Sequence, residues 1–305
     1  MAGPRGTALV VRREAIGSVT SLAESPFVQF DEGVLRSNFD VRPFKVTHAL
    51  ADHDLLSLPR VVDLAREISP SLVEYNTGQL PLNQDYLKTP TNGFSVEETI
   101  ERIEDCHLWM VLKHIQCSRR YRELLEDCLR PILRATDAAY PGTCMQAAFV
   151  FVSSPSAVTP YHMDPEHNFL LQVRGTKLMA VFDRADRTAV SEERIEALSL
   201  GGHRNLPFDE HLQSRESLFH LGPGDGVHVP TLSPHWVKVG SEVSISLSVT
   251  FRSMRNLRDA SVYRTNGRLR KLGLNPRPPG GGAWLDRVNW VADRVTDRLR
   301  SDVGR

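Results

Sequence analysis

Two histidines and one aspartate, placed in two distant segments of the chain, could together hold a metal ion. His162 and Asp164 lie in Tyr-His-Met-Asp (161–164), and His235 lies far downstream in Ser-Pro-His-Trp (233–236). A His-x-Asp pair with a distant histidine is the ligand set of the 2-His-1-carboxylate triad, which binds non-haem iron(II) on one face of the ion. The opposite positions stay open, and the net positive charge of such a centre favours an anionic chelator.

The segments around these residues could place them at the mouth of a small barrel. The His-x-Asp pair alone is a weak signal, because the chain has 11 histidines and such a triplet arises readily by chance. However, a predicted strand over 147–152 and a turn over 153–157 precede His162, and a short predicted strand over 226–230 precedes His235. A strand followed by a turn and a histidine aims a metal ligand into the opening of a barrel.

Other histidines could compete as ligands. His228 flanks a predicted strand, and we expect it to be a core histidine with its hydrogen bonds satisfied. His167 follows His162 closely, and we expect it in a loop. The polar insertion over 183–220 is expected to form surface loops, and it contains His203, His211 and His220.

Short apolar runs separated by Gly, Pro, Ser and Asp predict an antiparallel sandwich or barrel from about Gln146 to Phe251. In the last run, large apolar residues alternate with small hydroxyl residues, so one face of this strand packs in a core. The hydroxyl face could meet solvent or line a wet internal cavity. Strands are expected at 147–152, 169–173, 178–182, 226–230 and 243–251.

The flanking regions are predicted to be more helical. A strand is expected at 109–115, and helices at 58–68, 95–105, 119–138 and 284–300. A basic stretch after Phe251 reads as a solvated or dimer-facing surface rather than a nucleic-acid patch, because aromatic residues are nearly absent there. We therefore divide the chain into an N-terminal region (1–140) that helps to form the substrate pocket, a catalytic core (141–255), and a basic segment, Pro/Gly linker and C-terminal helix (256–305).

Bulk composition excludes some classes of partner. The chain carries 37 basic and 37 acidic residues, so nothing global favours nucleic acid or an anionic membrane. No stretch approaches a membrane span or the apolar region of a signal peptide. The four cysteines form no CxxC pair, so we expect buried thiols rather than a zinc site. These features predict a cytoplasmic protein with no membrane partner.

The combined spacing of these segments resembles the JmjC family of 2-oxoglutarate-dependent oxygenases. The resemblance rests on Thr-x-x-His-x-Asp (159–164), Asn-Phe-Leu-x-Gln-Val-x-Gly-x-Lys (168–177), Pro-Gly-Asp to His-Trp (223–236) and Ser-Ile-Ser-Leu-Ser-Val-Thr-Phe (244–251). Within the family, the chain is most similar to the cupin-like branch that includes the asparaginyl hydroxylase acting on hypoxia-inducible factor. The resemblance implies a mainly β fold with a double-stranded β-helix (jelly-roll) core, flanked by the helical N-terminal region and the C-terminal helix.

The resemblance also implies the residues that bind the co-substrate. Lys177 would pair with the distal carboxylate of 2-oxoglutarate and Thr159 would supply a hydroxyl partner, while Asn168 and Thr250 match positions near the co-substrate. Close relatives often carry Asn where this chain has Thr250. Other 2-oxoglutarate oxygenases anchor the carboxylate with an arginine where Ile245 stands, so its absence favours Lys177.

An inward-facing Lys177 in an apolar strand would itself require an anionic partner, although the same lysine could face outward. The residues next to the metal ligands, Tyr161, Met163 and Trp236, are candidates for the substrate wall, with a core position as the alternative.

The sequence therefore predicts an Fe(II)- and 2-oxoglutarate-dependent oxygenase that uses O2. We expect it to hydroxylate an unactivated C–H bond of a small molecule, peptide or protein side chain and to release succinate and CO2. A metal-binding cupin that does not use 2-oxoglutarate and a non-catalytic regulatory JmjC-like protein are the alternatives. A homodimer through the C-terminal helix is a further expectation.

Overall fold

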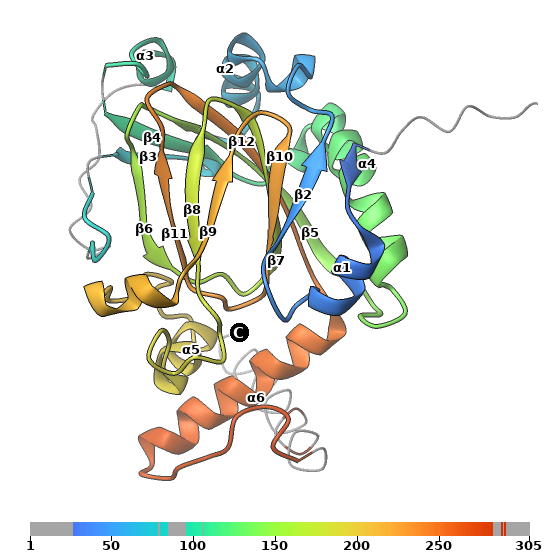
Figure 1. Cartoon of the computed structure of the whole chain (residues 1–305), viewed down its shortest axis with the longest axis vertical. Helices are drawn as coiled ribbons and strands as arrows, with labels where there is room; N and C mark the ends of the chain where they lie inside the picture. Colours follow the sequence, from blue (N-terminus) through green and yellow to red (C-terminus); the bar gives the residue numbers. More distant parts are fainter. Residues whose placement is uncertain are drawn as a thin grey trace, which may run out of the picture.

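Two antiparallel β-sheets face each other and form the core of the fold (Figure 1). The structure is a computed structural model that describes residues 27–78, 80–84, 96–105 and 107–282, together with residues 288 and 290. In this part of the chain, an eight-stranded sheet has the order β1 (Val28–Gln29), β2 (Phe44–His48), β10 (Asp225–Val229), β7 (His167–Arg174), β12 (Ser244–Arg252), β5 (Cys144–Ser153), β4 (Leu108–Leu112) and β3 (Val73–Thr77). A four-stranded sheet has the order β6 (Val158–His162), β11 (His235–Val239), β8 (Lys177–Val181) and β9 (Ser217–Leu221).

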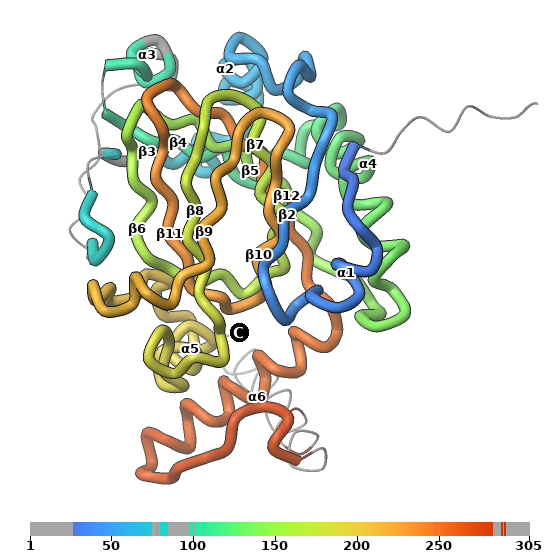
Figure 2. The backbone as a smooth tube through the Cα atoms, in the orientation of Figure 1, coloured from blue at the N-terminus to red at the C-terminus, as the bar shows by residue number. Residues whose placement is uncertain are grey.

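From β5 to β12 the chain passes repeatedly from one sheet to the other, as the backbone tube shows (Figure 2). Only β8 and β9 are consecutive strands that stay within one sheet over this stretch. The interior between the sheets is filled by apolar side chains from both, including Leu170 and Val229 of the large sheet and Met179 and Val237 of the small one. This arrangement is a double-stranded β-helix, so the predicted jelly-roll core with flanking helices is confirmed.

Strand β12 shows how the sequence pattern sets the two faces of the large sheet. Its apolar residues, such as Leu247 and Val249, belong to a large outer core beneath the helices. Its hydroxyl residues face the barrel interior, where Ser248 Oγ donates a hydrogen bond to Asn168 Oδ1 (2.7 Å) and Ser246 Oγ donates one to Gln172 Oε1 (2.7 Å). The hydroxyl face of this strand therefore lies inside the barrel and is buried rather than exposed to solvent.

Helices cover the outside of the barrel. The helices α1 (Glu32–Asn38), α2 (Leu58–Glu67) and α4 (Arg119–Thr136) contribute apolar residues to the core on the outer face of the large sheet. Helix α3 (Val96–Glu101) precedes β4. At one end of the barrel, α5 (Glu192–Ser199) packs against α6 (Met254–Lys271) (Figure 1). No helix in the described ranges is long and apolar enough to cross a membrane.

The predicted elements of the core agree with the structure to within a few residues, but several others were missed. No helix or strand was predicted in the first 45 residues, and yet they contain β1, α1 and the start of β2. The 183–220 insertion, predicted as loops, contains α5 and the strand β9 that pairs with β8. The predicted helix over 284–300 lies outside the described residues, apart from positions 288 and 290.

The basic stretch after Phe251 forms the long helix α6, which was not predicted. Its N-terminus has a capping box, in which Ser253 and Asn256 exchange side-chain and backbone hydrogen bonds. Its buried residues include Ser261 and Asn266. The buried residues also include Val262 and Tyr263, but a face that mixes polar and apolar side chains gives no clear apolar periodicity, and this explains why the helix was not recognised.

The prediction of buried thiols was correct for one cysteine and wrong for another. Cys128 lies on the buried face of α4, and burial raises the pKa of its thiol to about 12. Cys117 is exposed, and Cys144 is half-buried. Cys106 lies outside the described residues.

Four aromatic rings stack under the large sheet. Phe44 and Phe39 lie on either side of His228, each with its ring centroid 4.8 Å from that of His228, and His167 stacks on Phe39 at 4.6 Å. His167 is thus the first residue of a buried strand rather than a loop residue. His228 lies in the core as predicted, but the expected hydrogen bonds are not found, because neither of its ring nitrogens has a hydrogen-bond partner among the described residues. Burial lowers the pKa of His167 to about 4 and the pKa of His228 well below 6.5, so both rings are neutral at pH 7.

These two histidines should make the fold sensitive to acid. In the unfolded chain they take up protons below about pH 6.5, whereas the folded chain resists protonation. Stability is therefore lost as the pH falls, by about 2 kcal/mol for each histidine between pH 6.5 and 5. Replacement of His228 by Phe keeps the stack and removes one titrating group, so the loss of unfolding free energy between these pH values should shrink by that amount in urea titrations.

His211 provides the control, because its side chain is almost fully exposed. A His211→Gln variant should keep the pH dependence of the wild-type protein. If His228→Phe also keeps it, the buried ring at this position is not a source of acid sensitivity.

Candidate metal centre

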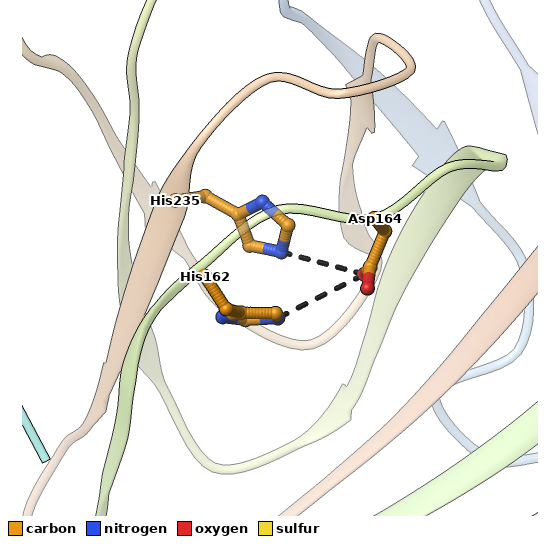
Figure 3. Close-up of side chains that lie close together, drawn as sticks. All are labelled: His162, Asp164 and His235. Atoms are coloured by element: carbon orange, nitrogen blue, oxygen red, sulfur yellow. Dashed lines mark ion pairs between the residues drawn. The ribbon is translucent and has the colours of Figure 1, made fainter. Parts of the chain in front are cut away.

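His162, Asp164 and His235 converge at one end of the barrel, where β6 ends and β11 begins (Figure 3). Asp164 Oδ2 lies 3.8 Å from His162 Nε2 and 3.7 Å from His235 Nε2, and one potential ligand atom from each residue lies within 4.8 Å of the others. Metal–ligand bonds of about 2.1 Å place two ligands of one ion at most about 4 Å apart. The three residues that the sequence singled out therefore form a group that one ion could bridge.

Strand pairing brings the two histidines together. His162 is the last residue of β6 and His235 is the first of β11, and they are direct cross-strand partners. Asp164 follows in the turn between β6 and β7. The backbone N–H of Leu232 donates to the carbonyl oxygen of Asp164 (2.7 Å), so this turn is tied to the loop that leads into His235.

Each imidazole is oriented by its own backbone. His162 Nδ1 lies 2.8 Å from the carbonyl oxygen of Pro160, and His235 Nδ1 lies 2.9 Å from that of Ser233. A carbonyl oxygen can only accept, so Nδ1 carries the proton and donates in both rings. The lone pair of each Nε2 is then directed at Asp164, which is the tautomer that metal-binding histidines need.

The electrostatics of the site keep both rings neutral and the carboxylate charged. Burial lowers the pKa of His162 to about 3, aided by the neighbouring His235, and burial also lowers the pKa of His235. For Asp164, burial alone would raise the pKa, but electrostatic interactions with His162, Arg204 and His235 and the hydrogen bond from Arg204 together hold it below its ordinary value. Two neutral imidazoles and one carboxylate are the donor set expected for iron(II).

Arg204 is a residue of the site that the sequence did not reveal. Its Nη1 donates to Asp164 Oδ1 at 2.6 Å, which leaves Oδ2 facing the two histidines. Its backbone carbonyl oxygen accepts the N–H of Met163 (3.1 Å). Arg204 lies in the insertion that was predicted to be surface loops, and no local pattern links it to a residue so far away in the sequence.

Lys177 faces the barrel interior. On β11, Val239 pairs with Lys177 and Val237 pairs with Thr159, so both predicted co-substrate residues lie on the inner face of the small sheet. The Lys177 side chain is buried, with its Nζ 5.7 Å from the centroid of the Phe151 ring. Among the described residues none forms an ion pair with Lys177, and burial lowers its pKa to about 7.

Asn168 and Thr250 are cross-strand partners on the inner face of the large sheet. Asn168 Oδ1 accepts a hydrogen bond from Ser248, while the Thr250 hydroxyl donates to the carbonyl oxygen of Ala147 (3.3 Å). Both are buried, and Asn168 lies only four residues after Asp164 along the chain.

The residues next to the metal ligands lie in a core, as the alternative reading of the sequence had it. Side chains alternate along a strand, so where His162 and His235 point inward their neighbours point outward. Tyr161 and Met163 are fully buried in an apolar cluster outside the small sheet, and Trp236 packs against it. The Tyr161 hydroxyl donates to the carbonyl oxygen of Ala189 (3.0 Å). The substrate wall must therefore be formed by other residues.

The chain has the double-stranded β-helix fold of the JmjC and cupin proteins. Its structure is similar to that of YcfD from Escherichia coli, with a TM-score of 0.53 and 16% sequence identity over 88% of this chain and 68% of YcfD. A further structure, described as the ribosomal oxygenase YcfD with cobalt and 2-oxoglutarate, matches with a TM-score of 0.47 and 16% identity over 87% of this chain and 65% of that one.

No family model matches the sequence, and no curated protein matches it. The chain thus spans about two thirds of the length of YcfD and shares its fold at low sequence identity. These matches do not support the narrower resemblance to the asparaginyl hydroxylase branch, which stays a prediction.

Removal of the Arg204 guanidinium should weaken metal binding. Partners that orient a ligand typically contribute 10–100-fold to affinity. Arg204 is half-exposed and solvent screens its charge. We therefore expect Arg204→Gln to lower the metal affinity by about tenfold, the lower end of this range. The measurement is a titration of the metal-free protein with Co(II), followed by its visible absorption.

A matched control is Arg215→Gln. Arg215 is as exposed as Arg204 and pairs with a similarly buried carboxylate, that of Asp186, away from the metal ligands. Equal Co(II) affinities of the two variants would show that the Arg204–Asp164 pair does not orient the ligand.

Proposed function

We propose that this chain is an Fe(II)- and 2-oxoglutarate-dependent oxygenase. The observation that carries the proposal is the convergence of His162, Asp164 and His235 at one end of a jelly-roll barrel whose inner face also holds a buried lysine. A structural lysine in such a place would be expected to have a carboxylate partner. Among the described residues Lys177 has no such partner, so a bound dicarboxylic acid would supply the missing charge.

The roles of the residues follow from their chemistry. His162, Asp164 and His235 would hold the iron, and Lys177 with Thr159 would hold the distal carboxylate of 2-oxoglutarate. The iron, when bound, would supply the activation of O2 for oxidation of a substrate C–H bond, coupled to conversion of 2-oxoglutarate to succinate and CO2. The chain itself orients the imidazoles through Pro160 and Ser233 and keeps Asp164 ionised.

The barrel interior suits a small polar ligand. The hydroxyl-bearing face of β12 and the amides of Asn168 and Gln172 line it, and apolar residues such as Leu170 and Val237 fill the remainder. We propose that Asn168 and Thr250 lie near the co-substrate. The side chains of β12 on this face are small, and the surrounding apolar residues would exclude bulk water from the charged groups.

YcfD, with which the chain shares its fold, has been solved with cobalt and 2-oxoglutarate, and this guides the choice of ligands for testing. The substrate is proposed to be a small molecule or a peptide or protein side chain that is hydroxylated at carbon. A cupin that binds a metal but not 2-oxoglutarate would not need Lys177, so the variants of this residue described below separate the two functions.

Replacement of Asp164 by Ala tests the metal centre. The variant loses the only anionic ligand, and two neutral imidazoles should bind Fe(II) at least about a hundredfold more weakly. Iron content after anaerobic loading should fall to background, and so should succinate release from 2-oxoglutarate. Asp63→Ala removes an exposed carboxylate on α2 and should change neither quantity. Retention of iron by Asp164→Ala would remove this residue from the site.

Binding of 2-oxoglutarate should depend on pH through Lys177. The pKa of this lysine in the free protein is about 7, so above pH 7 it must first take up a proton to pair with a carboxylate. The dissociation constant of 2-oxoglutarate for the Co(II)-loaded protein should therefore rise about tenfold for each pH unit above 7. Calorimetric titrations between pH 6.5 and 8.5 measure it.

Two variants of Lys177 complete this test. Lys177→Arg keeps its charge at every pH and should flatten the pH dependence. Lys177→Met should weaken binding strongly at all pH values while Co(II) binding is retained. A flat profile in the wild-type protein, or unchanged affinity in Lys177→Met, would show that another group holds the carboxylate.

A further inference from the structure

A cavity at the α5–α6 end of the barrel lies outside the proposed iron and 2-oxoglutarate sites. It has a volume of about 1020 Å³ and is bounded by α5, α6, the segment after β8 and the loop before His235. Figure 1 shows α5 and α6 side by side at this end of the sheets. Part of its lining is apolar or aromatic, with Ile195, Leu232, Val262, Tyr263 and Trp290.

The charged residues of the cavity are predominantly basic. Arg184, Arg187, Arg255 and Arg258 line it, and Asp259 is the one acidic residue among the described residues of the lining. Two of the arginines are already paired. Arg184 binds Asp40 (3.0 Å), and Arg187 binds Glu192 (2.6 Å).

The other two arginines have no such partner. Arg255 and Arg258 are exposed, and neither forms an ion pair with any residue that the structure describes. They lie three positions apart on α6, where side chains are neighbours and like charges repel each other. An anion between them would relieve this repulsion, whereas a neutral ligand would not.

The wall of the cavity is continuous with the metal centre. Pro165, which lines it, directly follows Asp164, and Leu232, which also lines it, donates its N–H to the carbonyl oxygen of Asp164. Arg184 donates from Nη1 to both the carbonyl oxygen (3.1 Å) and the hydroxyl (2.6 Å) of Thr231. A ligand here would therefore touch the loops that carry the metal ligands.

We propose that this cavity binds a small organic anion. Its phosphate or carboxylate group lies between Arg255 and Arg258, and its apolar or aromatic body packs against Leu232 and Tyr263. The volume is at the upper end of the range of small-molecule pockets. The mixture of unpaired cations with apolar walls selects a ligand that has both parts. This proposal goes beyond the oxygenase function and does not depend on it.

The test is calorimetric titration of the metal-free protein, without 2-oxoglutarate, with phenyl phosphate. Inorganic phosphate and benzyl alcohol supply the anionic and the aromatic part alone. We expect saturable binding of phenyl phosphate, weaker binding of inorganic phosphate and no binding of benzyl alcohol. The double variant Arg255→Gln/Arg258→Gln should weaken phenyl phosphate binding about tenfold or more, because charge-assisted hydrogen bonds are lost.

The matched control is Arg120→Gln/Lys271→Gln, which removes two exposed positive charges that do not line the cavity. It should bind phenyl phosphate as the wild-type protein does. Ala260→Trp, which places a large side chain in the cavity and keeps both arginines, should also abolish binding. Circular dichroism verifies that each variant is folded.

Several results would overturn the proposal. These are the absence of saturable binding to the wild-type protein, unchanged affinity in the double variant, and an equal loss in the control variant, which would indicate general charge attraction. Equal affinities for inorganic phosphate and phenyl phosphate would reject the role of the apolar wall. Because no metal or co-substrate is present, none of these results bears on the oxygenase function.

Discussion

The antiparallel register of β11 between β6 and β8 is the constraint on which the whole site depends. It pairs His235 with His162 at one end of the small sheet and Val239 with Lys177 at the other. Because side chains alternate along strands, this register also directs the histidines and the lysine to the same interior. A shift of one residue in β11 would turn His235 outward and replace it with a neighbour of the outer core.

Burial of the interior decides the charges of the groups that the register brings together. It keeps the two imidazoles neutral and lowers the pKa of the Lys177 ammonium. The one carboxylate of the triad stays ionised only because neighbouring positive and polar groups outweigh the cost of burial. A bound cation would neutralise the Asp164 carboxylate, and an anionic chelator beside it would pair with the Lys177 ammonium. The fold alone leaves both charges incompletely neutralised.

The parts of the structure that could be predicted are those whose signal is local. The alternation in β12 lies within a few residues and placed its apolar face in a core. The His-x-Asp pair is equally local, and it identified residues that lie close together in the structure. Helix α6 was not predicted because its buried residues mix polar ones, such as Ser261 and Asn266, with the apolar Val262 and Tyr263, so no clear apolar periodicity appears. Arg204 was not predicted as a site residue because its contact with Asp164 depends on how the 183–220 insertion folds back onto the barrel. The strands β6 and β11, which contain the two histidines, were not predicted. If they had been, the alternation of side chains between the two faces of a strand would have placed Tyr161 and Trp236 outside the barrel.

The hydrogen bond from Leu232 to the carbonyl oxygen of Asp164 has a consequence for the order of assembly. The two segments that it joins are far apart in the sequence and belong to loops that cross the same end of the barrel, so they meet only after both sheets have paired. Binding of an ion by the proposed ligands would then be a late event in folding. A bound ion would link two loops at opposite ends of a long stretch of chain, and it should slow unfolding more than it speeds folding.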